Sequence, residues 1–251
     1  MTNSSVTQLQ RKKINRFVLS VIAAALIIVG CSGGTPETFS GQDAALPMDP
    51  TIDGFAFPNF GEQDTNEFLG AADLVIMFGP TVCTDEITDP CRPIAEAAAW
   101  AMMVNSARAS GHCEGFAVQS ALRFDEQAEP KTIFLPKDTN VTRALIRGFA
   151  TQFLPEVQKE TTKWAKKSLK EKVDALIKSF SAATPDTDSK SLAEPYGQAQ
   201  FTAGLYTEVG GHALLPYAVA FVDETTARIS VLDSNWPGRE RYITVDLAAN
   251  E

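Results

Sequence analysis

Thiol and imidazole chemistry has few possible places in this chain, because its 251 residues include only four cysteines and two histidines. Cys113 lies in Gly-His-Cys-Glu-Gly-Phe (111–116), where Gly111 should end one helix and a second helix should begin. The thiolate is the nucleophile in thiol catalysis, and the N-terminus of a helix favours negative charge. The sequence therefore predicts Cys113 as a nucleophile, with an inert buried thiol as the alternative.

A thiol nucleophile needs a base, and the base needs an orienting partner. His212 follows Gly210-Gly211 at the expected start of a strand, and Asp233 ends the strand expected to pair with it. We expect His212 to be the base and Asp233 its partner, with Asn235 as the alternative third member. The competing interpretations are a core histidine bonded to backbone and a turn-forming aspartate. His112 is a rival base, but adjacent residues at a helix start point apart.

This order of residues resembles the papain-like cysteine peptidase superfamily. The string Asp-Ser-Asn-Trp-Pro-Gly (233–238) is similar to the Asn-Ser-Trp-Gly of papain-like enzymes. GHCEGFA and GGHALLPYAV look closer to bacterial branches, namely peptidases resembling the bacteriocin-leader proteases and transglutaminase-like proteins. The resemblance implies a hydrolase or acyl transferase that acts on an amide bond of a peptide or protein substrate. The Asp-Cys-Ser-Gly of bacterial cell-wall endopeptidases is absent.

The sequence departs from this pattern at the oxyanion hole. Papain-like enzymes usually carry a glutamine six residues before the nucleophile, and here that residue is Ala107. Asn105, or Ser106, is the candidate substitute from further back along the helix, with the backbone N–H of Cys113 as the second donor. The alternative function is a non-catalytic, lipid-anchored binding or scaffold protein on the same fold. A weaker one is a module that reads cell-wall peptides without cutting them.

The elements that must position these residues change character along the chain. An alanine-rich helix is expected after Pro93, a second helix from Cys113, and a long amphipathic helix over 153–180, broken at most once. Residues 72–78 fit either a strand or a buried helical turn. Four β-rich runs follow, at 201–209, 217–223, 227–233 and 241–247. We therefore expect an α+β fold: N-terminal helices on a C-terminal antiparallel sheet, with a helical insert at about 150–182.

The first thirty residues have the proportions of an export signal. The basic stretch Arg11–Arg16 precedes about 14 apolar residues, fewer than the roughly 20 that span a bilayer. The end of this run, Ile-Val-Gly-Cys (28–31), resembles a bacterial lipobox, which implies cleavage before Cys31 and its acylation. We expect a signal at 1–30, a flexible Gly/Pro-rich tether at 31–58, and a domain at 59–251. The protein would then lie in the bacterial cell envelope, lipid-anchored and facing the extracytoplasmic side.

Export to an oxidising compartment also bears on the other cysteines. Cys83 and Cys91 flank a short polar loop and are expected to form a disulfide, which leaves Cys113 unpaired. The formal charge is −9, and loss of the four basic signal residues would leave 18 basic against 31 acidic residues, a charge of −13. So acidic a chain is not expected to bind nucleic acid. The sequence contains no recognisable metal or cofactor motif, and we expect neither.

Overall fold

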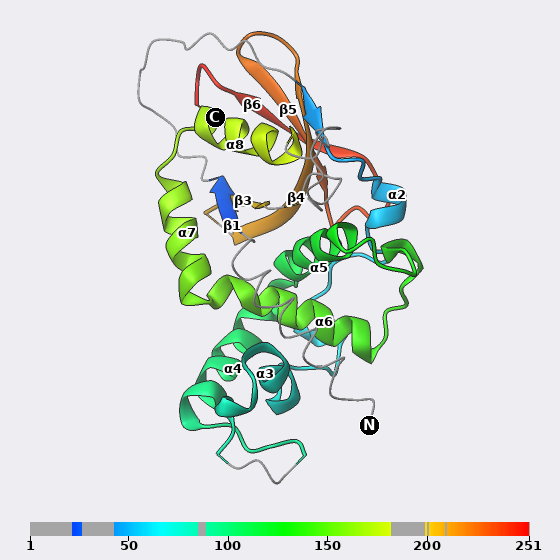
Figure 1. Ribbon diagram of the computed structural model, residues 1–251, viewed down its shortest axis with the longest axis vertical. Helices are drawn as coiled ribbons and strands as arrows, with labels where there is room; N and C mark the ends of the chain where they lie inside the picture. Colours follow the sequence, from blue (N-terminus) through cyan, green and yellow to red (C-terminus); the bar gives the residue numbers. More distant parts are fainter. Residues whose placement is uncertain are drawn as a thin grey trace, which may run out of the picture.

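The computed structural model describes residues 22–26, 43–84, 89–181, 199, 201–208 and 210–250. Helices come before the main sheet in the sequence (Figure 1). The helices are α2 (Pro50–Asp53), α3 (Ala71–Phe78), α4 (Ala95–Ala107), α5 (Cys113–Asp125), α6 (Thr139–Ala150), α7 (Pro155–Ala165) and α8 (Leu169–Ser181). The strands are β1 (Ile22–Leu26), β2 (Ala44–Ala45), β3 (Phe201–Thr207), β4 (Gly210–Phe221), β5 (Thr226–Leu232) and β6 (Arg241–Asp246).

The sheet is built around β4, its longest strand. Strands β3, β4, β5 and β6 are antiparallel neighbours in that order, as the short connections between the last three strands predict. Strand β2 pairs with β4 near Val219, beyond the segment of β4 that pairs with β3. The register places Leu205 opposite His212 and Leu215 opposite Leu232. Residues 212 and 233 therefore lie near the same end of the sheet. The expected α+β class is confirmed.

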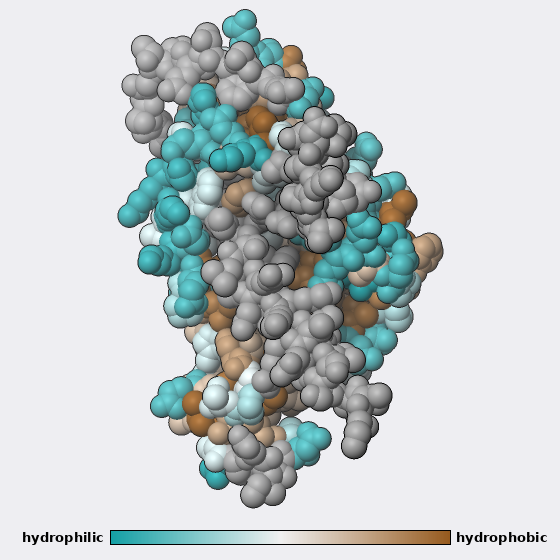
Figure 2. Space-filling view, in the orientation of Figure 1, coloured by the Kyte–Doolittle hydropathy of each residue, from teal (hydrophilic) through white to brown (hydrophobic). Residues whose placement is uncertain are grey.

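Helices α5 and α8 cover the sheet, and α3 and α4 lie at the far end of the molecule (Figure 1). The main core lies between α5, α7, α8 and the strands, where side chains such as Val173, Leu215 and Ile229 are fully buried. The amphipathic pattern at 153–180 forms two helices, α7 and α8, with the break at residues 166–168. Their outward side is hydrophilic, as Figure 2 shows along α7.

Two helical predictions need correction or completion. Residues 72–78 are part of α3, not a strand, and Asp73 is fully buried there between Arg143 and Arg147 of α6. Helix α4 forms where expected but is less buried than its alanine content suggests. Only Ala101 and Val104 are buried on it, because the helix lies at the edge of the molecule and exposes its opposite side.

The expected flexible tether is wrong for its second half, because residues 43–58 pack on the domain. Strand β2 joins the sheet, and Asp49 caps α2 through the backbone N–H of Thr51. The rings of Phe55 and Phe57 lie 5.2 and 5.7 Å from that of Phe116 on α5. Apolar side chains thus hold a segment that its glycine and proline content marked as a linker. The first part of the expected tether, up to residue 42, lies outside the described residues.

Most of the expected signal, and Cys31, also lie outside the described residues. Residues 22–26 form β1, which pairs in parallel with β3. Cleavage before Cys31 would remove β1 and leave β3 at the edge of the sheet. Within the described part of the chain, we find no helix with the length and apolar character needed to cross a bilayer.

The cysteine pairing is as expected. Cys83 and Cys91 form a disulfide with their Cα atoms 5.8 Å apart. The disulfide closes the loop between α3 and α4. An isolated antiparallel β-bridge pairs the backbones of Cys83 and Pro93 beside it. Cys113 is a free thiol of intermediate exposure.

Candidate active site

The local sequence fixes where α5 begins. A single turn of 3₁₀ helix at Arg108–Ser110 ends the preceding helix, and Gly111 follows with a φ of +141°, which L side chains rarely adopt. His112 is the N-cap and Cys113 is the first helical residue. The N–H of a first helical residue has no partner within its own helix. The thiol therefore lies at the positive end of a 13-residue helix.

His112 is a structural residue and not the rival base. It is fully buried, with Nδ1 2.6 Å from the backbone oxygen of Phe60 and Nε2 3.4 Å from Nη1 of Arg108. Burial, opposed by the hydrogen bond to Phe60, lowers the pKa of His112, and the charge on Arg108 adds to this. A neutral imidazole with both nitrogens engaged in the core supports the turn before α5 and does not reach substrate.

Asn59 connects this turn to the loop that follows β5. Its backbone N–H donates to the carbonyl of Ser234 at 2.8 Å, and its Oδ1 accepts from the backbone N–H of His112 at 2.7 Å. A Cβ at Gly111 would lie 2.6 Å from Nδ2 of Asn59, so this contact needs the glycine. Asn59 thus fixes the start of α5 relative to residues 233–235. Sequence reasoning missed it, because it lies far from both segments in the chain.

The imidazole of His212 joins the other two predicted residues. Its Nε2 lies 2.8 Å from Oδ1 of Asp233 and 3.3 Å from Nδ2 of Asn235. The ring also interacts with the side chain of Cys113, which lies close enough to affect its charge. Burial lowers the pKa of His212, but the hydrogen bonds and negative charges of Asp233 and Cys113 outweigh it and raise the pKa to about 9. At neutral pH the imidazole is therefore protonated between a sulfur and a carboxylate.

Asp233 both forms a turn and contacts His212, the two roles that the sequence left open. Its Oδ1 accepts the backbone N–H of Asn235 at 2.9 Å, which is a turn-forming contact, and the same atom contacts the ring of His212. Burial raises the pKa of Asp233, but the hydrogen bonds from His212 and Asn235 more than compensate and hold it below its usual value. The carboxylate is charged and orients the imidazole.

The oxyanion role expected of Asn105 is wrong. Its Oδ1 accepts the backbone N–H of Leu69 at 2.9 Å, and its Nδ2 donates to the carbonyl of Leu69 at 3.1 Å. Both ends of the amide therefore hold the segment before α3 against α4. The extra turn at 108–110 separates α4 from α5, so a residue on α4 does not continue the helix that carries the thiol.

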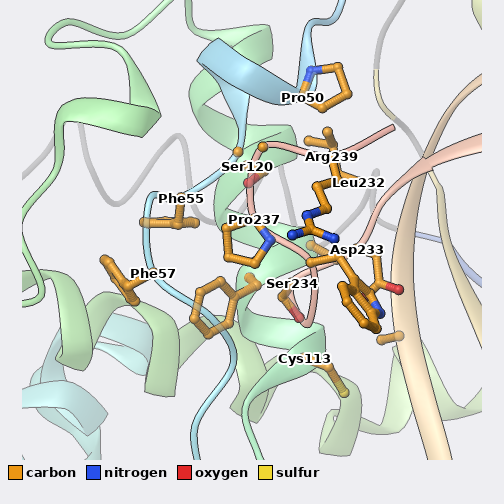
Figure 3. A pocket seen from close by; sticks show the side chains of 16 residues that line it. Pro50, Phe55, Phe57, Cys113, Ser120, Leu232, Asp233, Ser234, Pro237 and Arg239 are labelled. Carbon is orange, nitrogen blue, oxygen red and sulfur yellow. The ribbon is translucent and has the colours of Figure 1, made fainter. Parts of the chain in front are cut away.

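A cleft extends from Cys113 along α5 (Figure 3). It encloses about 400 Å³, including space open to solvent. Phe55 and Phe57 form one wall, and Pro237, Asp233 and Arg239 lie across from them (Figure 3). Ser234 also lines the cleft, and its buried Oγ has no hydrogen-bond partner in the described part of the chain. The cleft therefore offers an apolar wall and a cationic side chain along α5 from the thiol.

Glu114 is the second group near the thiol that sequence reasoning missed. It is the residue after Cys113, its side chain is buried, and its Oε1 accepts from Oγ1 of Thr202 on β3 at 3.1 Å. Burial raises the pKa of Glu114 to about 7, and the bond from Thr202 only partly offsets this. A carboxyl that holds its proton near neutral pH adds less negative charge beside the sulfur than an ordinary glutamate would.

Among the described residues, no group of three or more histidine, cysteine, aspartate or glutamate side chains is arranged to hold a metal ion. No protein-family model, no curated protein and no solved structure matches the chain.

Proposed function

We propose that the protein is an exported thiol hydrolase or acyl transferase that acts on an amide bond of a peptide or protein, with a papain-like arrangement of Cys113, His212 and Asp233. One observation carries the proposal. A free thiol at a helix start interacts with an imidazole whose Nε2 is held by a half-buried carboxylate. The side chains come from α5, β4 and the loop after β5, in the order of the papain-like superfamily.

The geometry supports a two-step reaction. The sulfur of Cys113, as the thiolate, attacks the amide carbonyl carbon, and the C–S bond forms as the carbonyl oxygen takes the negative charge. The protonated His212 gives its proton to the leaving amine as the C–N bond breaks, which leaves a thioester. Neutral His212 then takes a proton from water, the hydroxide attacks the thioester, and the acid and the thiolate are released. An amine in place of water would give acyl transfer.

The cleft supports a peptide as the substrate. Its wall of Phe55, Phe57 and Phe116 favours an apolar side chain near the reacting carbonyl. Arg239 lies beside the exposed ring of Trp236 and gives the rim positive charge in an otherwise acidic chain. We infer that the preferred substrate pairs an apolar residue with a nearby acidic group.

The first test is selective alkylation of the thiol. Iodoacetamide at pH 6 should modify Cys113 at least tenfold faster than it modifies the same cysteine in urea-unfolded protein, because His212 and the helix start favour the thiolate. Peptide mapping by mass spectrometry gives the site and the rate. A His212→Gln variant should lose this advantage, and a Gln158→Ala variant on the exposed side of α7 is the matched control. Slow alkylation of the folded protein would favour the scaffold alternative.

Localisation is a separate proposal, which rests on the apolar run and on Ile-Val-Gly-Cys at 28–31. Changing Cys31 to Ser should abolish incorporation of a radiolabelled fatty acid and shift the protein from the membrane pellet to the soluble fraction of a bacterial host. The reason is that acyl chains, and not the acidic domain, would hold it at the membrane. Unchanged acyl labelling of the Cys31→Ser variant would refute a lipid anchor at this residue.

A further inference from the structure

The proposed reaction needs hydrogen-bond donors for the negative oxygen that forms when the thiolate attacks a carbonyl. Removing one such donor typically costs about 10²–10³ in rate. The backbone N–H of Cys113 is one donor, because it begins α5. Asn105, the side chain that the sequence suggested as the other, holds Leu69 instead. A further donor must come from another element near the thiol.

Tyr206 on β3 is the candidate for this second donor. The register pairs it with Gly211, the residue before His212. A Cβ on Gly211 would lie 2.8 Å from Cδ1 of Tyr206, and a Cβ on Gly204 would lie 2.9 Å from its hydroxyl oxygen. The ring therefore lies flat over two glycines, with its hydroxyl directed back along β3 from residue 206 towards residue 204. Side chains at both glycine positions would displace it.

The hydroxyl lies on the face of β3 that meets the start of α5. Residues 202, 204 and 206 share one face of the strand, because side chains alternate. Thr202 on this face donates to Glu114, which follows the thiol in the first turn of α5. The hydroxyl of Tyr206, over Gly204, therefore lies on the same face of β3 as Thr202, whose partner Glu114 follows the nucleophile. The side chain remains 52% exposed, so a substrate can reach it.

We propose that the hydroxyl of Tyr206 donates a hydrogen bond to the oxyanion formed when Cys113 attacks a substrate carbonyl. The inference rests on the proposed function, since it needs a nucleophilic Cys113. The O–H bond is not broken in this step: the proton stays on Tyr206, and the charge on the oxygen is stabilised until the carbonyl re-forms. Partial burial raises the pKa of Tyr206, and Glu114 and Cys113 add to this when they are ionised, which keeps the donor protonated.

Two reagents separate this role from a structural one. p-Nitrophenyl acetate acylates a thiolate through a tetrahedral oxyanion, whereas iodoacetamide alkylates it by displacing iodide from carbon, with no oxyanion. A Tyr206→Phe variant keeps the ring over the glycines and removes only the hydroxyl. We expect its acylation rate, followed as the burst of p-nitrophenolate, to fall at least tenfold and towards the 10²–10³ limit. Its alkylation rate at Cys113 should stay within twofold of the unmodified protein.

The outcomes are distinguishable. The matched control is Tyr242→Phe, an exposed tyrosine on β6 that stacks on Arg228, and both of its rates should be unchanged. Equal loss of both rates in Tyr206→Phe would show that Tyr206 supports the thiol or the fold, and unchanged acylation would show that it donates nothing. Either result overturns this inference and leaves the proposed function standing. No Cys113-dependent burst in the unmodified protein would overturn both.

Discussion

Replacing His212 by Gln should slow the hydrolysis of the acyl-enzyme by about 10²–10⁴, the usual contribution of a general acid–base residue. The reason is that water must lose a proton as it attacks the thioester, and His212 is the imidazole that interacts with the nucleophile. With p-nitrophenyl acetate the first leaving group needs no proton, so this loss should appear in the steady-state release of p-nitrophenolate. The burst itself should slow only by the loss of thiolate that the alkylation test measures. Cys113→Ala should show neither the burst nor steady-state turnover above that of buffer.

Asp233→Asn is the graded comparison for this prediction. It should cost less than His212→Gln, because the imidazole keeps its contact with Cys113 and Asn235 lies 3.3 Å from the same ring nitrogen. The neutral amide would also remove a charge that raises the pKa of His212. The pH above which the imidazole loses its proton should therefore fall from about 9. Full turnover in His212→Gln would show that the base is another group and would remove the basis for the triad.

The sequence was sufficient to predict the residues that now lie together, for a local reason. Gly111 before Cys113 marks a helix start, and the double glycine before His212 marks a strand start. Asp233 directly follows the paired strand, and antiparallel pairing brings that end back to His212. Each of these signals lies within a few residues of the sequence, and the antiparallel sheet expected from the fold class brings the segments together. The disulfide between Cys83 and Cys91 was also predictable from a local signal, because the two cysteines are only eight residues apart in the sequence.

The parts that failed depend on contacts between distant segments. Residues 43–58 have a linker's composition, and only the packing of Phe55 and Phe57 on α5 shows that they belong to the domain. Asn105 has a side chain that could donate to an oxyanion, and it lies shortly before Cys113 in the sequence. In the structure both ends of its amide are hydrogen-bonded to the backbone of Leu69. Tyr206 carried one local hint: Gly204 and Gly211 leave its ring room, which is visible only once the register of β3 and β4 is known.

Gly115→Ala should be the most damaging of the conservative substitutions on α5. A Cβ at this position would lie 2.1 Å from the carbonyl oxygen of Leu145 on α6, a separation that real Cβ atoms essentially never show, and 3.0 Å from the backbone nitrogen of Phe149. The obstacle is helix backbone and not a flexible side chain, so α5 and α6 must move apart. Overpacking typically costs about 1–3 kcal/mol, and more when the backbone must shift. A gain of about 1 kcal/mol from helix propensity does not offset this.

We therefore expect Gly115→Ala to lower the free energy of unfolding by about 2 kcal/mol or more, measured from the midpoint of urea denaturation. Because Gly115 is two residues from the nucleophile, any shift of α5 also moves the sulfur relative to His212. A misplacement of about 1 Å can cost 10²-fold in rate, so acylation by p-nitrophenyl acetate should fall even where the variant is fully folded.

Gly148→Ala, whose Cβ would lie 3.1 Å from the backbone of Gly115, is the milder comparison from the other helix. It should lose less stability and less activity, because a few tenths of an ångström relieve it. If Gly115→Ala matched the unmodified protein in both measurements, α5 and α6 could not approach as closely as the structure shows, and the position of Cys113 would not depend on that contact.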